Sequence, residues 1–176
     1  MVSNITDARK FAKRKHAGQL RKNGKTTTFS HLKDVVKNLK KMKVTNNDII
    51  CAGWLHDTIE DTDTDFDSIK EKFGKNVADI VVSVTKDNRL PKKQREMKYG
   101  KDLKSSNSKA KIVKIADILA NVNDAPNAGK NSRWEKQQFV KKSKYWKYVS
   151  DVKPGRLAEL TWAKHEWKKL QDRYSN

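Results

Sequence analysis

The sequence predicts an all-α fold that forms a single domain. Apolar residues recur at helical spacing through almost the whole chain, and no alternation of apolar and polar residues is long enough to indicate a strand. The 176 residues match the length of one domain, and no internal repeat, low-complexity tract or linker rich in Pro, Gly or Ser divides them. We therefore expect a bundle of helices around one apolar core.

The amino-terminal part is expected to form three helices before an acidic loop. Two apolar stripes mark the first two helices, with core positions Ala8, Phe11 and Ala12, then Leu32, Val35, Val36 and Leu39. Gly18 closes the first of these helices. A third helix is expected over residues 48–58, with Asn47 or Thr45 as its amino-terminal cap.

The middle of the chain is also expected to be helical. A helix ends at Gly74, which is a plausible left-handed terminator, and another begins near Val77. The β-branched residues of segment 80–85 leave a strand open as an alternative there. Pro91 is expected to open the next helix, because proline is tolerated in the first turn.

The last third of the chain contains three expected helices. The polar segment 105–108 caps the first of them, whose core positions are Ile112, Ile115, Ala116 and Leu119. The other two cover approximately residues 134–149 and 156–173, and Pro154 and Gly155 separate them.

The charge balance points to anionic partners. Forty Lys and Arg residues against 21 Asp and Glu residues give a formal net charge of +19. Such a field attracts nucleic acid, anionic membranes or multiply phosphorylated small molecules. The lysines are spread over every segment, which is also typical of a solvated surface, so the charge alone does not choose among these partners.

The cysteine content and the hydropathy pattern exclude two classes of protein. Cys51 is the single cysteine and lies in an apolar run, so we expect it to be buried, and no disulfide can form within the chain. No stretch approaches the ~20 apolar residues that span a bilayer, and the amino terminus has no apolar signal core. We expect a soluble, cytoplasmic protein that does not insert in a membrane.

The segment His56-Asp57-Thr58-Ile59-Glu60-Asp61 is the strongest indication of chemistry. It places a His and an Asp one helical turn before a Glu and an Asp, so the four groups are expected to share one flank of a helix. His56 and Asp57 can ligate a divalent cation, and Glu60 and Asp61 can orient or deprotonate a water molecule. The alternative is a solvated acidic loop beside a buried histidine.

A second polar group lies on the helix that follows residue 108. Lys114, Asp117 and Asn121 recur at i, i+3 and i+7, off the apolar stripe. Asp117 is a candidate ligand and Asn121 a candidate substrate contact. Alternatively, Asp117 is an ordinary exposed carboxylate that pairs with Lys114. Partial burial beside the apolar face would require a cation near Asp117.

Several segments in order resemble the HD-domain metal-dependent phosphohydrolases. The likeness is closest to the alarmone-hydrolase branch, which comprises the hydrolase domain of the RelA/SpoT homologues and the small alarmone hydrolases of the Mesh type. The segments are AKRKHAGQLRKNG at 12–24, His31, WLHDTIEDT at 54–62, Leu90 to Lys92 with Arg95, and KIVKIADILAN at 111–121. The resemblance implies an HD-type helical domain over residues 1–150, with a carboxy-terminal helix in 151–176 packed on it.

The same resemblance implies a role for each matching residue. The metal ligands would be His31, His56, Asp57 and Asp117, holding Mn²⁺. Glu60 and Asp61 would be the catalytic residues that position or activate the attacking water. The substrate contacts would be Arg21, Lys22, Asn121, Lys92 and Arg95.

The resemblance implies a Mn²⁺-dependent (p)ppGpp 3′-pyrophosphohydrolase that releases GDP or GTP and pyrophosphate. Segment 26–32 lacks the Pro-Tyr pair common in the family, so the same site could act on another nucleotide: an adenosine alarmone, a 3′-phosphorylated nucleotide or NADPH. An alternative of another class is a basic nucleic-acid-binding protein that stacks bases on aromatic residues. These residues are Trp134, Tyr145, Trp146, Tyr148, Trp162 and Trp167.

Overall fold

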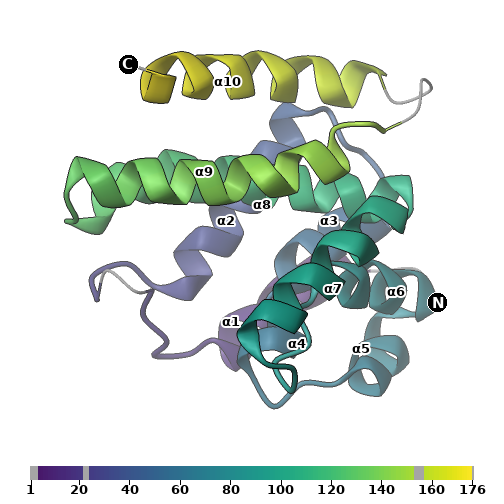
Figure 1. The fold of residues 1–176 in the computed structure, drawn as a ribbon. Coiled ribbons are helices and arrows are strands. Elements are labelled where there is room, and N and C mark those ends of the chain that lie inside the picture. The colour runs from purple at the N-terminus through teal and green to yellow at the C-terminus, as the bar shows by residue number, and fades with distance from the viewer. Residues whose placement is uncertain (1–3, 22–23, 153–156, 176) are drawn as a thin grey trace.

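The computed structural model describes residues 4–21, 24–152 and 157–175, with side chains from residue 160 onward in the last of these ranges. The elements are α1 (Ile5–Lys15), α2 (Thr28–Lys41), α3 (Asn47–Leu55), α4 (Thr58–Asp61), α5 (Phe66–Phe73), α6 (Lys75–Val84), α7 (Lys92–Ser105), α8 (Ser108–Asp124), the 3₁₀ turn η1 (Ala125–Ala128), α9 (Ser132–Val149) and α10 (Leu157–Ser175) (Figure 1). Within the described ranges β pairing is limited to an isolated bridge between Leu20 and Thr27. The predicted all-α fold is confirmed, and segment 80–85 is the end of a helix rather than a strand.

Side-chain caps explain where several helices begin. The side chains of Asn4, Thr27, Asp65 and Asn107 accept hydrogen bonds from backbone N–H groups of the first turn that follows. The cap of α3 is Asn46, whose Oδ1 accepts from the N–H of Ile49 at 3.2 Å, so the expectation of Asn47 or Thr45 was wrong. Pro154 and Gly155, expected to separate the last two helices, lie outside the described residues.

The helix expected over residues 48–58 is interrupted at His56 and Asp57. α3 ends at Leu55, and α4 begins at Thr58 after Asp57 has turned to φ −96° and ψ −4°. The Thr58 hydroxyl donates to the Leu55 carbonyl at 2.6 Å, and His56 Nδ1 donates to the Gly53 carbonyl at 3.0 Å. These local side-chain bonds replace backbone bonds of a continuous helix.

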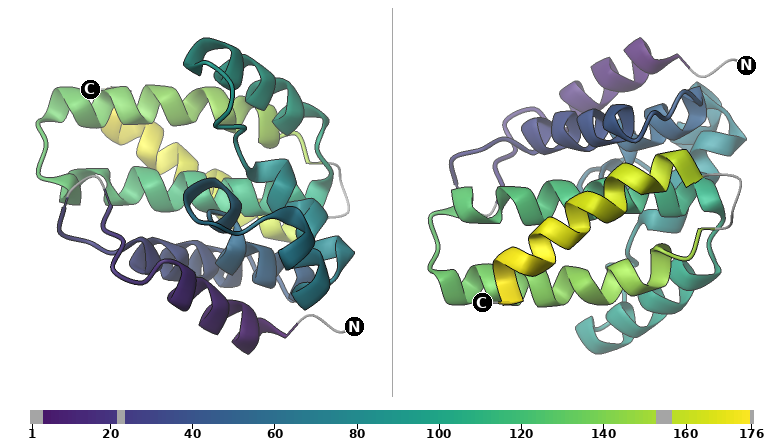
Figure 2. Two further views of the ribbon diagram at one scale, coloured as in Figure 1. Left: turned by 90° about the horizontal axis from the view of Figure 1, so that it is seen from below. Right: turned by 90° about the horizontal axis from the view of Figure 1, so that it is seen from above.

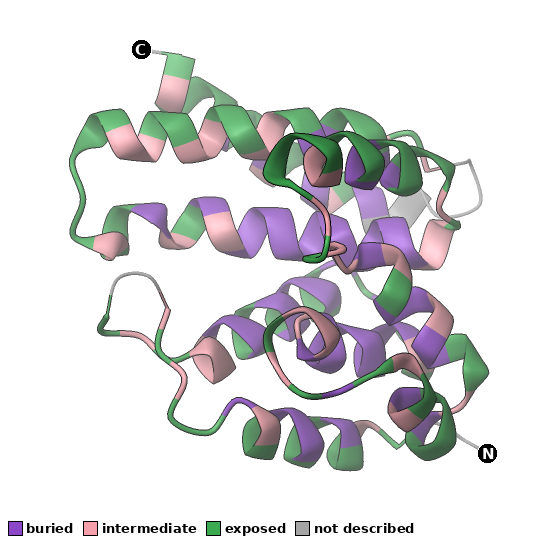
Figure 3. Ribbon diagram, turned by 60° about the horizontal axis from the view of Figure 1, so that its bottom comes forward, coloured by how far each residue is buried: buried purple, intermediate pink, exposed green. Residues whose placement is uncertain are grey.

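Helix α8 lies at the centre of the bundle. It contacts α2, α3, α6, α9 and α10, and Figure 2 shows it between α2 and α9, with α10 crossing one face. Every residue from 110 to 120 is buried, so the helix is enclosed rather than amphipathic (Figure 3). Residues 110–120 of α8 are therefore held by packing on all sides.

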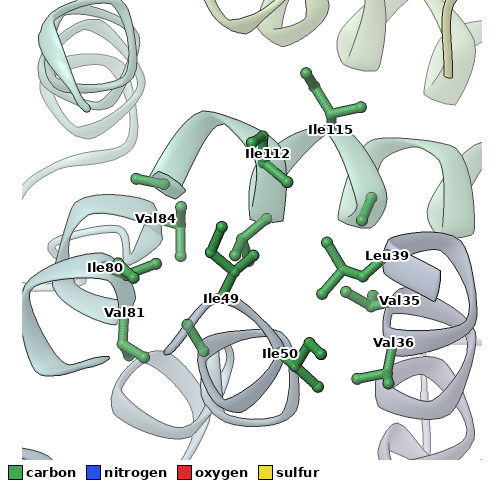
Figure 4. Close-up of a cluster of buried hydrophobic side chains, with 14 of the residues drawn as sticks. Val35, Val36, Leu39, Ile49, Ile50, Ile80, Val81, Val84, Ile112 and Ile115 are labelled. Carbon is green, nitrogen blue, oxygen red and sulfur yellow. The ribbon is translucent and has the colours of Figure 1, made fainter. Parts of the chain in front are cut away.

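The apolar core joins α8 to the helices around it. Figure 4 shows Ile112 and Ile115 of α8 together with Ile49 of α3, Leu39 of α2 and Val84 of α6. Cys51 is buried in the same core, as predicted, and burial raises the pKa of its thiol to about 12. No helix in the described part of the chain is both long enough and apolar enough to cross a membrane.

Four of the carboxy-terminal aromatic rings, those of Phe139, Trp146, Trp167 and Tyr174, stack between α9 and α10. Trp146 and Trp167 stack with their ring centroids 4.5 Å apart, and Phe139 stacks on Trp167 at 5.2 Å. Trp146 is 8% exposed and Trp167 is 5% exposed. These two rings are consequently occupied in packing and cannot stack on bases.

Candidate active site

Three distant parts of the chain meet in a cluster of potential metal ligands. His31 comes from α2, His56 from the break between α3 and α4, and Asp117 from the enclosed helix α8. One ligand atom from each lies within 4.8 Å of the others, and all three residues are buried. His31 Nε2 lies 3.1 Å from Asp117 Oδ1, and His56 Nε2 lies 3.7 Å from the same oxygen.

Asp57 lies beside this cluster. Its Oδ1 is 3.1 Å from His56 Nε2, and its Oδ2 is 3.8 Å from His31 Nε2. Its side chain is 25% exposed, whereas those of the two histidines are almost fully buried. The turn at residue 57 thus brings a fourth potential ligand, a second carboxylate, to the open side of the cluster, and the four residues expected to hold a metal lie together.

The chemistry of these donors fits a divalent metal ion. Since the Gly53 carbonyl can only accept, His56 Nδ1 carries a hydrogen, and in the neutral ring Nε2 is left with a free lone pair. Among the described residues, no hydrogen-bond partner satisfies this buried Nε2. Two imidazole nitrogens with carboxylate oxygens form a set that binds first-row divalent ions. The cluster is therefore a candidate centre for a divalent metal.

The charges in the cluster favour a cation at its centre. Burial by itself lowers the pKa of His56, but the carboxylates of Asp57 and Asp117 raise it to about 9. Burial would raise the pKa of Asp117, yet the Lys114 ammonium holds it well below its usual range. Burial lowers the pKa of His31 despite the opposing effect of Asp117. In the metal-free protein a proton on His56 supplies positive charge beside the two carboxylates.

Lys114 and Asn121 fix the orientation of Asp117. Lys114 Nζ donates to Asp117 Oδ2 at 2.8 Å, and the Asn121 side-chain amide donates to Asp117 Oδ1. The carboxylate is buried and paired, so the alternative of an exposed Asp117 is excluded, although its expected pairing with Lys114 is present. The three residues act as one hydrogen-bonded group on α8.

The acidic turn α4 is tethered on two sides. The backbone N–H of Lys86 donates to Glu60 Oε2 at 3.1 Å, and the Asn88 side chain donates to the Glu60 carbonyl at 3.1 Å. On the other side, the Gln19 side chain donates to the Asp61 carbonyl at 2.9 Å. The turn is therefore held by the segment after α1 and by the segment after α6.

A cleft of about 720 Å³ opens over the cluster. His31, Asp57, Glu60, Asp61 and Asp117 contribute to its lining, so three of the four candidate ligands and both candidate catalytic carboxylates face one space. The fourth ligand, His56, is buried next to Asp57 and Asp117 and does not line the cleft. A volume of this size accommodates a nucleotide.

The expected substrate contacts are divided between this cleft and other places. Arg21 lines it, donates to Asn121 Oδ1 at 2.9 Å and lies 3.4 Å from Asp124. Lys22 lies outside the described residues. Arg95 donates to Asn88 and lines a neighbouring hollow of about 460 Å³, and Lys92 is exposed on α7 outside both spaces.

Several residues of the cleft were missed by reasoning from the sequence. Lys86, Gln138, Lys141 and Lys142 line the side formed by α9 and the segment after α6. They belong to no motif, and the lysines among them are indistinguishable in sequence from the other basic residues. Gln19, which tethers the acidic turn, lies in the segment 12–24 but was not singled out there.

The comparisons with known proteins agree with this geometry. A family model described as HD domain matches residues 8–143. The guanosine-3′,5′-bis(diphosphate) 3′-pyrophosphohydrolase MESH1 of Xenopus tropicalis is 35% identical over 153 residues, which cover 86% of this chain and 83% of that protein. The protein of the same name from Danio rerio is 36% identical over 147 residues, covering 82% and 79%.

The fold itself has a solved counterpart. A structure described as a metazoan ortholog of SpoT that hydrolyzes ppGpp superposes with a TM-score of 0.84 and 25% identity, covering 96% of this chain and 94% of that one. Sequence and fold therefore lead to the same relatives. The chain belongs to the HD domain family and, within it, to the family of the MESH1-type guanosine-3′,5′-bis(diphosphate) 3′-pyrophosphohydrolases.

Proposed function

We propose that the chain is a Mn²⁺-dependent (p)ppGpp 3′-pyrophosphohydrolase that yields GDP or GTP and pyrophosphate. The observation that carries the proposal is the convergence of His31, His56 and Asp117 at the base of a cleft that His31, Asp117 and the carboxylates of Glu60 and Asp61 line. The names of the relatives supply the substrate. We also propose that residues 1–150 form the hydrolase domain and that 151–176 complete it.

In this proposal His31, His56, Asp57 and Asp117 hold the metal ion. The ion would supply Lewis-acid chemistry by lowering the pKa of water and offsetting charge on phosphoryl oxygens. Imidazole and carboxylate ligands are compatible with Mn²⁺. Lys114 acts indirectly, because its hydrogen bond keeps Asp117 ionised and oriented.

Glu60 and Asp61 are proposed to orient the attacking water and to take up its proton. Water adds to the phosphorus attached to the 3′ oxygen. The bond between this phosphorus and the 3′ oxygen breaks, and the 3′ oxygen receives a proton. The two phosphates leave together as pyrophosphate. Both carboxylates line the cleft, and a general base must lie within hydrogen-bond reach of its proton.

Arg21 and Asn121 are proposed to contact the sugar and a phosphate, since they bond to each other at the edge of the cleft. We retain Lys22 as a substrate contact from outside the described residues. Lys92 and Arg95 could contribute only if the nucleotide extended beyond this cleft.

The test is hydrolysis by metal-stripped protein with and without Mn²⁺. The substrates are ppGpp, its adenosine counterpart and NADPH, and ion-exchange chromatography resolves the products. We expect Mn²⁺-dependent release of GDP and pyrophosphate from ppGpp, and its loss in the double variant Glu60→Gln, Asp61→Asn. Turnover of NADPH or the adenosine nucleotide alone would transfer the same site to another substrate. Undiminished Mn²⁺-dependent turnover by the double variant would refute the roles given to the carboxylates.

A further inference from the structure

Three lysines that line the cleft place their amines around the ring of one tyrosine. The Nζ atoms of Lys86, Lys114 and Lys142 lie 5.2, 5.4 and 6.0 Å from the centroid of the Tyr145 ring. They come from the segment after α6, from α8 and from α9, and all three line the cleft. The fold thus concentrates positive charge in the same space as the acidic metal cluster.

Two of these amines have carboxylate partners. Lys114 Nζ lies 2.8 Å from Asp117, and Lys86 Nζ lies 3.0 Å from Glu96, which also accepts a hydrogen bond from the Tyr145 hydroxyl. For Lys142, by contrast, no carboxylate within the described ranges lies at ion-pair distance. Lys142 therefore brings a positive charge to the cleft wall that the described part of the protein does not pair.

The surroundings of Lys142 make this charge costly in the absence of an anion. Its side chain is half-buried, and burial lowers the pKa of its ammonium to about 8. The neighbouring ammonium groups of Lys114 and Lys86 act in the same direction, whereas Asp117 and Asp57 oppose them. An anionic group in the cleft would remove the cost, because it would pair with the amine where solvent is limited.

We propose that Lys142, supported by Lys86, forms a subsite for the distal phosphate of the pyrophosphoryl group, and that it selects a diphosphate over a monophosphate at the reacting position. The proposal rests on the proposed function for the identity of the nucleotide. The metal cluster would take the phosphoryl group under attack, so the phosphate attached to it is the next anion that needs a cation. Lys142 lines the same cleft as Asp57 and Asp117, and its amine shares the Tyr145 ring with Lys114, which bonds to Asp117.

A binding experiment tests the subsite without turnover. The Mn²⁺-loaded protein is titrated with pyrophosphate and with orthophosphate in a calorimeter. Pyrophosphate can contact both the metal and Lys142, whereas orthophosphate needs only the metal. Lys142→Gln is expected to weaken pyrophosphate binding by about ten- to a hundredfold, the usual effect of one charge-assisted hydrogen bond. Orthophosphate binding should change by less than about twofold, and Lys142→Arg should keep most of the pyrophosphate affinity.

Lys144→Gln is the matched control, since it removes the same charge from the same helix at an exposed position that does not line the cleft. Equal effects of Lys142→Gln and Lys144→Gln on pyrophosphate binding would overturn the proposal. So would an equal loss of pyrophosphate and orthophosphate affinity in Lys142→Gln, because the residue would then not distinguish the two anions.

Steady-state kinetics provide a second test of the Lys142 subsite. The value of kcat/KM for ppGpp should fall by about tenfold or more in Lys142→Gln, while that for guanosine 5′-diphosphate 3′-monophosphate should change by less than about twofold. If the wild-type protein hydrolysed neither nucleotide, the proposed function would fail and the pyrophosphate titration would still decide the subsite. If wild type hydrolysed ppGpp and Lys142→Gln matched Lys144→Gln, the subsite alone would be refuted.

Discussion

The buried ion pair between Lys114 and Asp117 gives the sharpest prediction for stability. Lys114 Nζ and Asp117 Oδ2 are 2.8 Å apart, and the two side chains are only 8% and 5% exposed. In Lys114→Met the carboxylate stays buried without its ammonium partner. Breaking a buried pair in this way costs about 3–5 kcal/mol. We expect a loss of that size in the free energy of unfolding of the metal-free protein.

Lys98→Met is the control for this change. Lys98 Nζ lies 2.6 Å from Asp102, but the two side chains are 56% and 47% exposed. An exposed pair of this kind contributes at most about 1 kcal/mol. Urea denaturation in the presence of a chelator, monitored by tryptophan fluorescence, compares the free energies of unfolding of the two variants with that of the wild type. A loss in Lys114→Met no larger than that in Lys98→Met would refute the argument that burial makes the Lys114 pair important.

Bound Mn²⁺ should reduce the loss of stability in Lys114→Met. A divalent ion beside Asp117 replaces part of the missing positive charge, and an ion that binds only the folded state stabilises it by mass action. We therefore expect saturating Mn²⁺ to restore part of the stability of Lys114→Met and to have little influence on the deficit of Lys98→Met. An unchanged deficit in both variants would show that the ion does not bind next to Asp117.

Two further predictions concern the packing and the protonation of the site. Gly53→Ala would place a Cβ 2.6 Å from Leu39 Cδ1. The cost of overpacking, about 1–3 kcal/mol, should outweigh the gain of about 1 kcal/mol in helix propensity. We therefore expect a lower Tm in thermal unfolding, and an unchanged or higher Tm would contradict this. At pH 7.5, binding of Mn²⁺ should release about one proton, because His56 in the metal-free protein has a pKa raised to about 9 and only its neutral ring ligates. The affinity for Mn²⁺ should then rise with pH and level off above about 9. Calorimetry in two buffers of different ionisation enthalpy measures the proton release. An affinity for Mn²⁺ that does not depend on pH between 7 and 9 would contradict this prediction.

The helices were predictable because their apolar spacing is a local property of the chain. The break at His56 and Asp57 was not, since the same residues fit the 3.6-residue period of a continuous helix. What ends α3 is a pair of side-chain bonds to the carbonyls of Gly53 and Leu55, and sequence spacing does not reveal them. The burial of α8 on every side between residues 110 and 120 was also not predicted. Lys111 resembles an exposed residue in the sequence, and only the fold brings Asp151 to it at 2.7 Å.

The candidate site was predictable to the extent that its residues belong to dense motifs. His56, Asp57, Glu60 and Asp61 are close in sequence and chemically distinctive. The structure places the three acidic residues on one cleft, with His56 buried against Asp57. The lysines that line the cleft belong to no such motif. Lys142 lies 56 residues after Lys86, and only the packing of α9 over the segment after α6 reveals that both line the same space.

The tethers on α4 have a consequence for how the chemistry of this protein can be dissected. Gln19 and Asn88 bond to the main-chain carbonyls of Asp61 and Glu60, not to their carboxylates. Replacing the side chain of Glu60 or Asp61 leaves these two anchors intact. The third bond, from the Lys86 N–H to Glu60 Oε2, uses the carboxylate and is kept only where residue 60 still offers a side-chain oxygen, as in Glu60→Gln. For Asp61, acid–base function and the placement of the turn therefore depend on different atoms, and the acidic group can be removed while the bonds from Gln19, Asn88 and the Lys86 N–H stay in place.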